Sequence, residues 1–252
     1  MKIVTYNMRC IWDGSDGVNS FLHRAYMVYE KLSAEKPDIV SFQEVREEHA
    51  AYLEKMFPEY LLIGHGRLED YSGEGVYTAI RRETMMLSAS EITWLSETPY
   101  LPASRFPEQS DCPRVVLMTL VRERASGRMI RVYNLHLDHI SENARRLGMQ
   151  CVLDRVTEEQ KKFPTETVIL GDFNARPDSV AIELCRAYPL VDLTDKIEAT
   201  FHGFGTRDPE IKIDYIFASE KLASAMVSCE AWTECKHGIW LSDHYPVSAV
   251  FH

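Results

Sequence analysis

Polar side chains that can bind a metal or transfer a proton end several apolar, strand-like segments of this sequence. The segment VILGDFN carries Asp172 and Asn174, and the segment NLHLDH carries His136 and Asp138. Side chains two residues apart on a strand point to the same face, so we expect each pair to project together. Carboxylates and imidazoles take up and release protons in enzymes. The pattern therefore predicts acid–base or metal chemistry at the strand ends.

The same pattern recurs toward both ends of the chain. Strand-like segments there begin or end in further carboxylate, amide or imidazole side chains: Asn7, Glu44, Asp214, Asp243 and His244. In α/β proteins, ligands bind where the strands leave the sheet. Carboxylates gathered there repel one another, and a divalent cation relieves that repulsion. Oxygen ligands without cysteine favour Mg²⁺, with Mn²⁺ as a possible substitute, over zinc.

Each of these residues also has an ordinary structural explanation. Asn7 could be a turn residue, and Glu44 could complement a helix dipole. The pair Asp172 and Asn174 could form a turn before Pro177. Taken together, however, these explanations require several unrelated coincidences, all at strand ends.

Four other residues are weaker candidates. His202 in TFHGF is a possible substrate-binding residue, and Arg114 could bind a phosphate as a fork donor or form a strand-edge salt bridge. Glu74 lies between glycines, which is typical of a loop. His139 follows His136 by three residues, so on a strand it would face the opposite side; we interpret it as a surface or loop residue and not as a zinc ligand. Trp94 and Trp240 are expected to serve packing rather than base stacking.

The composition describes an ordinary soluble protein and disfavours some functions. Of the 252 residues, 45% are hydrophobic and 26% charged, and the formal net charge is −10. The chain has no block of Lys and Arg, which disfavours tight non-specific binding of duplex DNA but leaves short or single-stranded ends open. The six cysteines form no C-x-x-C pair, so we expect reduced thiols. With neither a signal-peptide pattern nor a membrane-span pattern, a cytoplasmic location is expected.

Strand-like segments outnumber helical ones. Nine segments are predicted to be strands, because many of them are rich in Val, Ile, Tyr and Phe and are bounded by turn or charged residues. They are 2–7, 38–44, 75–82, 91–96, 115–123, 129–137, 167–174, 212–219 and 245–251. Helical spacing of apolar residues indicates four helices: 20–35, 46–57, 142–162 and 178–187. Residues 97–114 read as a long surface loop. Strands without intervening helices over 75–137 favour two packed sheets with outer helices over a Rossmann order, in one domain covering 1–252.

The ordered set of motifs resembles the endonuclease/exonuclease/phosphatase superfamily, which is similar to deoxyribonuclease I. The motifs that carry the resemblance run through the whole chain: TYN, SFQEV, NLHLDH, GDFN, IDYIF and SDH. The segments TWLSETP, NARPDS and TFHGF look most like compact bacterial members near the deadenylase and sphingomyelinase branch. The resemblance implies a four-layer α/β/β/α sandwich with two mixed sheets flanked by helices.

The resemblance also implies roles for the site residues. Glu44 would be the principal metal ligand, assisted by Asn7 and possibly by Asp243. Asp172 would deprotonate the attacking water, with Asn174 holding the water and a phosphate oxygen. His244 would bind or protonate at the phosphate, kept in position by Asp214. His136 would donate a hydrogen bond to a non-bridging phosphate oxygen.

These roles describe a phosphoesterase in which an activated water attacks the phosphorus in line. We expect a phosphodiesterase such as a 3′–5′ exonuclease, acting on single-stranded nucleic acid or a nucleotide. A hydrolase of a small phosphorylated metabolite or phospholipid headgroup is the alternative, and a non-catalytic binding module is a third. No protein partner is implied. The loops at 64–75, 97–114 and 202–211 are expected to set specificity.

Overall fold

The computed structural model describes residues 1–11 and 15–252. The strands of the two main sheets are β1 (Lys2–Asn7), β2 (Ile39–Val45), β3 (Tyr60–Gly66), β4 (Gly75–Arg81), β5 (Met85–Trp94), β6 (Val115–Glu123), β7 (Met129–His136), β8 (Glu166–Asp172), β9 (Leu190–Asp192), β10 (Asp214–Ser219), β11 (Met226–Ala231) and β14 (Val247–Phe251). A small ribbon is formed by β12 (Cys235–Lys236) and β13 (Ile239–Trp240). The helices are α1 (Phe21–Glu35), α2 (Glu47–Met56), α3 (Glu142–Lys162), α4 (Val180–Arg186) and α5 (Glu220–Ala223), with a 3₁₀ turn at Gly17–Asn19.

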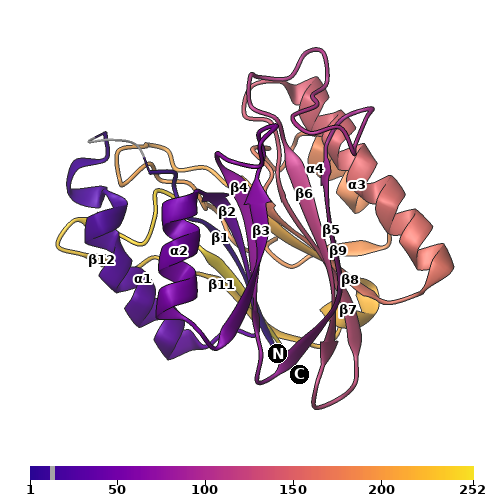
Figure 1. The fold of residues 1–252 in the computed structure, drawn as a ribbon, viewed down its shortest axis with the longest axis horizontal. Coiled ribbons are helices and arrows are strands. Elements are labelled where there is room, and N and C mark those ends of the chain that lie inside the picture. Colours follow the sequence, from indigo (N-terminus) through magenta and orange to yellow (C-terminus); the bar gives the residue numbers. More distant parts are fainter. Residues whose placement is uncertain (12–14) are drawn as a thin grey trace.

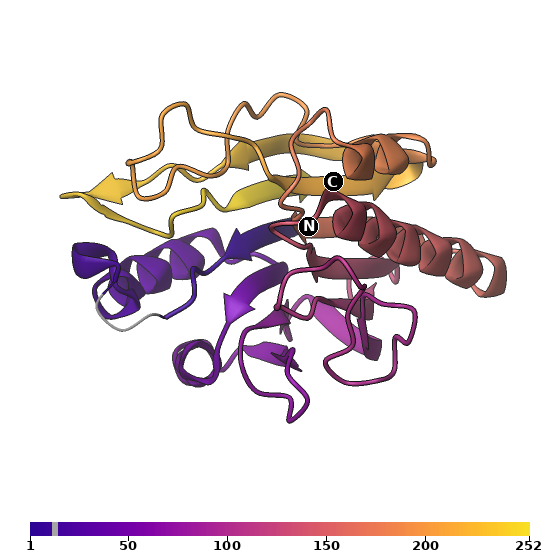
Figure 2. The same ribbon diagram turned by 90° about the horizontal axis from the view of Figure 1, so that it is seen from above.

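Two six-stranded mixed sheets pack face to face. The first has the order β11-β14-β1-β2-β4-β3 and the second the order β5-β6-β7-β8-β10-β9. Helices α1 and α2 cover the outer face of the first sheet, and α3 and α4 cover that of the second (Figures 1 and 2). The predicted four-layer sandwich is confirmed.

The buried strands are apolar on both faces because each sheet packs against the other sheet on one face and against helices on the other. In β1, Ile3 packs against the facing sheet, whereas Val4 packs under helix α1. Side chains alternate between the two faces of a strand, so such a strand reads as a nearly continuous apolar run. The same holds for VIL in β8, where Val168 faces the other sheet and Ile169 faces α3.

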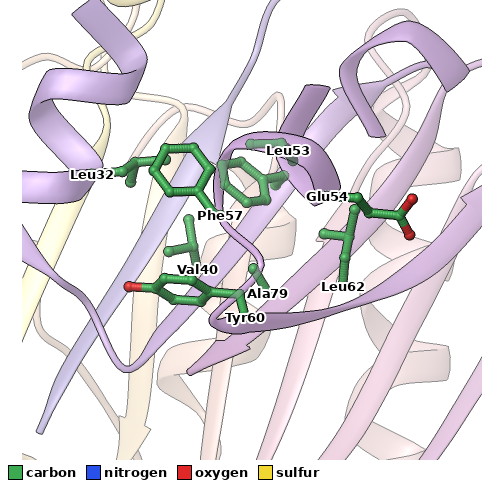
Figure 3. A pocket seen from close by; sticks show the side chains of 9 residues that line it. Leu32, Val40, Leu53, Glu54, Phe57, Tyr60, Leu62 and Ala79 are labelled. Carbon is green, nitrogen blue, oxygen red and sulfur yellow. The ribbon is translucent and has the colours of Figure 1, made fainter. Parts of the chain in front are cut away.

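The helices bury one stripe each, as their spacing predicted. In α3, Val152 and Val156 pack on the second sheet, and the Ser141 hydroxyl caps the helix by accepting from the backbone N–H of Ala144 at 3.1 Å. Helices α1 and α2 meet the first sheet around a small apolar cavity of about 20 Å³, drawn in Figure 3, between Leu32 and Leu53. No helix in the described residues is long and apolar enough to cross a membrane.

Several strand predictions need correction. The strand predicted at 91–96 is β5, which begins earlier, at Met85. It pairs with β6 from Met85 to Trp94 and so extends along the full length of that neighbour. Strands β3 and β11 were not predicted at all. Each pairs with one neighbour at a sheet edge, and four of the six residues of β11 are exposed, so the apolar alternation that marks a strand is weak there.

Gly171 lets two strands approach closely just before Asp172. Its φ is +143°, and a Cβ at this position would lie 1.9 Å from the backbone oxygen of Leu135 in β7. Only glycine avoids that overlap while adopting this backbone conformation. The glycine in GDFN therefore fixes how β8 delivers Asp172 beside β7.

We predict that Gly171→Ala destabilises the protein by more than about 3 kcal/mol, because backbone atoms would have to move. Gly238→Ala is the matched control: φ is +77° there, but no atom lies within 4 Å of the added Cβ, so only the conformational cost of about 1–2 kcal/mol applies. Urea unfolding of both variants measures the difference, and equal losses would contradict the steric argument.

Candidate functional site

Strand register in the second sheet aligns three functional side chains. Asp214 on β10 lies opposite Asp172 on β8, and Asp172 lies opposite His136 on β7. Neighbouring strands are about 4.8 Å apart, so the three side chains leave the sheet as one row. The imidazole Nε2 of His136 lies 3.5 Å from Oδ2 of Asp172.

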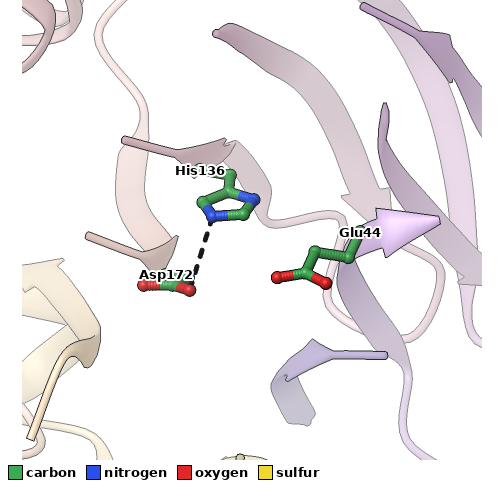
Figure 4. Close-up of side chains that lie close together, drawn as sticks. All are labelled: Glu44, His136 and Asp172. Carbon is green, nitrogen blue, oxygen red and sulfur yellow. Dashed lines mark ion pairs between the residues drawn. The ribbon is translucent and has the colours of Figure 1, made fainter. Parts of the chain in front are cut away.

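The first sheet supplies two more groups from neighbouring strands. Asn7 ends β1, and Glu44 lies near the end of β2 at a break in the pairing with β4. Glu44 has φ +58°, a left-handed conformation that costs a non-glycine residue of the order of 1–3 kcal/mol. Figure 4 shows Glu44, His136 and Asp172 together; one ligand atom of each lies within 4.8 Å of the others.

Asn7 joins the two sheets across the site. Its amide nitrogen donates to Oε1 of Glu44 at 3.1 Å and to Oδ2 of Asp172 at 3.0 Å. Its amide oxygen accepts from the backbone N–H of Arg9 at 2.9 Å. Asn7 thus presents a donor to both carboxylates. Its role as a metal ligand, which the resemblance implies, stays a prediction.

Asp243 and His244 enter the site from the segment before β14. His244 Nδ1 lies 2.8 Å from Oδ2 of Asp214, and its Nε2 lies 3.8 Å from Oδ2 of Asp172. Since the Asp214 carboxylate is an acceptor, the Nδ1 of His244 is the donor in that hydrogen bond. Asp243 Oδ2 lies 3.7 Å from the guanidinium of Arg9.

The two imidazoles of the site have opposite charge preferences. Burial disfavours the charged form of His244, but the charge of Asp214 and its hydrogen bond outweigh burial and raise the His244 pKa to about 10. For His136, burial and the cation of Arg114 lower the pKa well below its ordinary value. At neutral pH His244 is therefore an imidazolium and His136 a neutral imidazole.

The carboxylates of the site have pKa values that differ from their ordinary ones. Burial and the charge of Asp214 raise the pKa of Asp172 to about 7. Burial also raises the pKa of Asp243. Glu44 is the exception: although burial opposes its ionisation, the backbone N–H of Cys10, 2.7 Å from Oε2, helps to lower its pKa.

This donor set fits a divalent cation. Glu44, Asp172 and Asp243 offer oxygen ligands in a crowded, buried site, and a cation among them would relieve the repulsion that raises the pKa of Asp172. Glu44 also belongs to a set of three potential ligands within 4.8 Å of one another.

The site opens into a cleft of about 730 Å³ at the strand ends of both sheets. Seven of the predicted site residues line it: Glu44, Arg114, His136, Asp172, Asn174, Asp243 and His244. Asn174 has φ +48°; its backbone N–H donates to Oδ1 of Asp172 at 2.8 Å and its Nδ2 donates to the backbone oxygen of Leu137 at 3.1 Å. This left-handed turn holds Asn174 beside Asp172.

Comparison with known proteins agrees with this geometry. The model of the Endonuclease/Exonuclease/phosphatase family matches residues 4–244. The chain belongs to the Endonuclease/Exonuclease/phosphatase family. It is a metal-dependent phosphoesterase, as the resemblance of its motifs predicted. Among curated protein sequences, none matches this chain.

Solved structures of this family share the fold over the full length. A family member from Bacteroides vulgatus is 26% identical with a TM-score of 0.90, covering 100% of this chain and 98% of that chain. The mannosyl-6-phosphatase Bt3783 of Bacteroides thetaiotaomicron is 23% identical with a TM-score of 0.89, covering 100% and 99%. TDP2 of D. rerio, solved with a single-strand DNA product, is 19% identical with a TM-score of 0.76, covering 100% and 98%.

His202 and Asp138 take different positions from those predicted. The ring of His202 is fully buried and stacks on Tyr245 at 4.1 Å. His202 does not line the cleft, so it packs under the loop that carries Arg207, and the prediction of substrate contact is corrected. Asp138 does not project with His136: β7 ends at His136, and the Asp138 carboxylate instead accepts from the backbone of the next turn.

The cleft residues that sequence reasoning missed include several arginines. Glu74, named as a possible neighbour of the metal, does line the cleft, and it pairs with Arg67 at 2.9 Å. Arg114 lines the cleft as well, and so does His139, which is an exposed loop residue as expected. The arginines that were not named as site candidates are Arg9, Arg67, Arg145, Arg176 and Arg207. The loop position of His139, directly after the end of β7, was the signal that could have revealed it.

We predict that Asp214→Asn lowers the pKa of His244 from about 10 toward its ordinary value, because the main stabilising charge is removed. A folded-state pKa above 6.5 gives stability that is complete below pH 6.5 and lost as pH rises through about 10; the variant should lose this alkaline dependence.

NMR titration of the His244 ring in EDTA measures the shift. Asp16→Asn is the control, because Asp16 pairs with Arg9 and not with His244, so the pKa of His244 should stay as in the wild type. An unchanged His244 titration in Asp214→Asn would contradict the assignment.

Proposed function

We propose that this phosphoesterase is a Mg²⁺-dependent phosphodiesterase that acts on a nucleotide or on the end of a single-stranded nucleic acid, as a 3′–5′ exonuclease would. The observation that carries the proposal is the position of Asp172. One carboxylate lies between a neutral imidazole 3.5 Å away and a charged imidazole 3.8 Å away, beside Glu44, at the base of an open cleft.

Asp172 is the general base in this mechanism. Its Oδ1 is held by the backbone N–H of Asn174, and its Oδ2 by the amide of Asn7. A water molecule hydrogen-bonded to this carboxylate transfers its proton to Asp172 as it attacks phosphorus. Asn174, which lines the cleft beside Asp172, orients that water and contacts a phosphate oxygen.

The two imidazoles act on the phosphate oxygens. His244, charged and held through Nδ1 by Asp214, directs Nε2–H toward the phosphate and stabilises the negative charge that builds up in the transition state. His136 is neutral and serves as a hydrogen-bond donor to a non-bridging oxygen. Environments that separate the pKa values of two like groups commonly assign them different roles.

Glu44 is the principal metal ligand in this proposal, with Asp243 as an additional one. Mg²⁺ prefers oxygen ligands and keeps several waters, so a few carboxylates suffice. The bound cation supplies charge neutralisation at the phosphate oxygens. Asn7 keeps Glu44 and Asp172 at a fixed separation through its two donated hydrogen bonds.

The shape of the cleft supports a diester. Residues from both sheets and from several loops line it, among them Arg207 and Arg145, so groups can extend from both sides of a phosphorus held at Asp172. TDP2 of D. rerio, of similar fold, was solved with a single-strand DNA product. Acidic net charge and the lack of a basic block favour a short or single-stranded substrate over long duplex DNA.

A phosphomonoester of a small metabolite, or a phospholipid headgroup, is the second candidate. It is supported by the mannosyl-6-phosphatase Bt3783, whose fold matches with a TM-score of 0.89 against 0.76 for TDP2. Such a substrate would use the same base and the same imidazoles.

We predict Mg²⁺-dependent hydrolysis of bis-p-nitrophenyl phosphate in preference to p-nitrophenyl phosphate. Asp172→Asn should slow hydrolysis at least about hundredfold, because the general base is removed. Release of p-nitrophenol measures both, and single-stranded oligonucleotides, nucleotides and sugar phosphates then define the substrate.

Turnover of the monoester alone would overturn the phosphodiesterase proposal. Undiminished activity of Asp172→Asn would overturn the catalytic role of this site.

A further inference from the structure

Arg114 is a buried cation whose hydrogen-bonding capacity is largely unused. It is only 4% exposed, yet its Nε and Nη1 have no hydrogen-bond partner among the described residues. The carboxylate nearest to it, that of Asp138, is 4.0 Å away and already accepts hydrogen bonds from Ser110, Ile140 and Ser141. Burying an unsatisfied guanidinium is costly, so a ligand that accepts from Arg114 is indicated.

Two other arginines of the cleft are each neutralised by a carboxylate. Arg9 pairs with Asp16 at 3.0 Å and Arg67 pairs with Glu74 at 2.9 Å. Arg114 has no carboxylate closer than the 4.0 Å of Asp138, although the chain has a formal net charge of −10 and acidic residues outnumber basic ones. The unpaired charge therefore does not reflect a generally basic surface.

His139 adds a donor of known direction. Its Nδ1 lies 2.9 Å from Nη2 of Arg114. A guanidinium has only donors, so Nδ1 must be the acceptor and the ring proton of neutral His139 lies on Nε2. Burial and the charge of Arg114 lower the pKa of His139, which keeps the ring in this neutral form.

The loop after β7 fixes this arrangement. The Asp138 carboxylate accepts from the backbone N–H groups of Ile140 and Ser141 at 3.1 and 2.7 Å, which shapes the turn that carries His139. The Asp138 carbonyl accepts from Nη1 of Arg145 at 3.0 Å, and Nε of Arg145 has no partner among the described residues. His139, Arg114 and Arg145 all line the cleft and present donors without acceptors.

The cluster lies beyond His136 as seen from the general base. The strands run in the order β10, β8, β7 and β6, and they place Asp214, Asp172 and His136 in one row. Arg114 immediately precedes β6, the next strand in that order. The β8 and β6 backbones are two strand spacings apart, roughly 10 Å. The donors of the cluster are therefore displaced along the cleft from Asp172.

We infer that Arg114, His139 and Arg145 form a second phosphate subsite, so that the preferred substrate carries a further phosphate group beside the one that is hydrolysed. A guanidinium fork and an imidazole N–H match the oxygens of a phosphate. The inference rests on the proposed function for the position of the reacting phosphate. It deepens that proposal by naming a substrate with two phosphates.

Two matched substrate pairs test the subsite in the holoenzyme. Thymidine 5′-(p-nitrophenyl phosphate) is compared with the same diester carrying a 3′-phosphate, and glucose 6-phosphate with glucose 1,6-bisphosphate. The wild type should prefer the member with two phosphates in whichever pair it hydrolyses. His139→Gln and Arg145→Gln should each reduce the ratio of the two kcat/KM values about tenfold, because one donor to a charged group is lost.

Arg146→Gln is the control, since the Arg146 guanidinium contacts Asn143 and does not line the cleft; its ratio should stay at the wild-type value. An unchanged ratio in His139→Gln and Arg145→Gln would overturn the second subsite. A parallel loss of kcat/KM on both members of a pair would overturn it as well, since it would indicate contact with the reacting phosphate instead.

Binding of inorganic phosphate in EDTA separates the subsite from catalysis. Calorimetry should show that the metal-free wild type binds phosphate and that His139→Gln and Arg145→Gln bind it about tenfold more weakly. Equal affinities in all three proteins would overturn the subsite. Phosphate binding without any hydrolysis of the substrate pairs would instead retain the subsite and reject the proposed function.

Discussion

The repulsion among buried carboxylates is the constraint on which the rest of the site depends. Glu44, Asp172, Asp214 and Asp243 come from both sheets and from a connecting segment, and burial raises the pKa of Asp172 and Asp243. The surrounding groups act against that repulsion. Asn7 donates to two of the carboxylates, and His244 adds a positive charge. A divalent cation completes the balance, so the metal requirement follows from the packing of the strand ends.

Backbone geometry is adapted to bring these charges together. Left-handed conformations at Glu44 and Asn174, with φ +58° and +48°, turn the chain sharply where the strands end. Gly171 admits the carbonyl of Leu135 at a distance that no side chain would allow. Such conformations persist only where the surrounding structure enforces them, and in active sites they hold reactive groups in position. The sandwich supplies that enforcement through strand pairing on both sides of β8.

Strand ends and their polar residues could be predicted from the sequence because alternation and apolar runs are local signals. The pairing of His244 with Asp214, across 30 positions, followed only from the resemblance to the family. His139 is a surface loop residue, as expected, but its place in the cleft could not be predicted, because the two-residue period of a strand does not hold beyond the end of β7, where a turn changes the direction of side chains. The unpaired state of Arg114 depends on which groups surround it in three dimensions, and no spacing in the chain encodes that.

The dependence of protein stability on added Mg²⁺ at different pH values is the measurement that tests the central claim most directly. Asp172 has a pKa of about 7 in the metal-free protein, so protons compete with the cation below that pH. Urea unfolding in excess Mg²⁺ and in EDTA should differ little near pH 5 and by about 2–3 kcal/mol near pH 8 at a hundredfold excess over Kd. Glu44→Gln should abolish most of this difference. A wild type whose stability ignores Mg²⁺ at both pH values, or a Glu44→Gln variant that responds as the wild type does, would contradict the account.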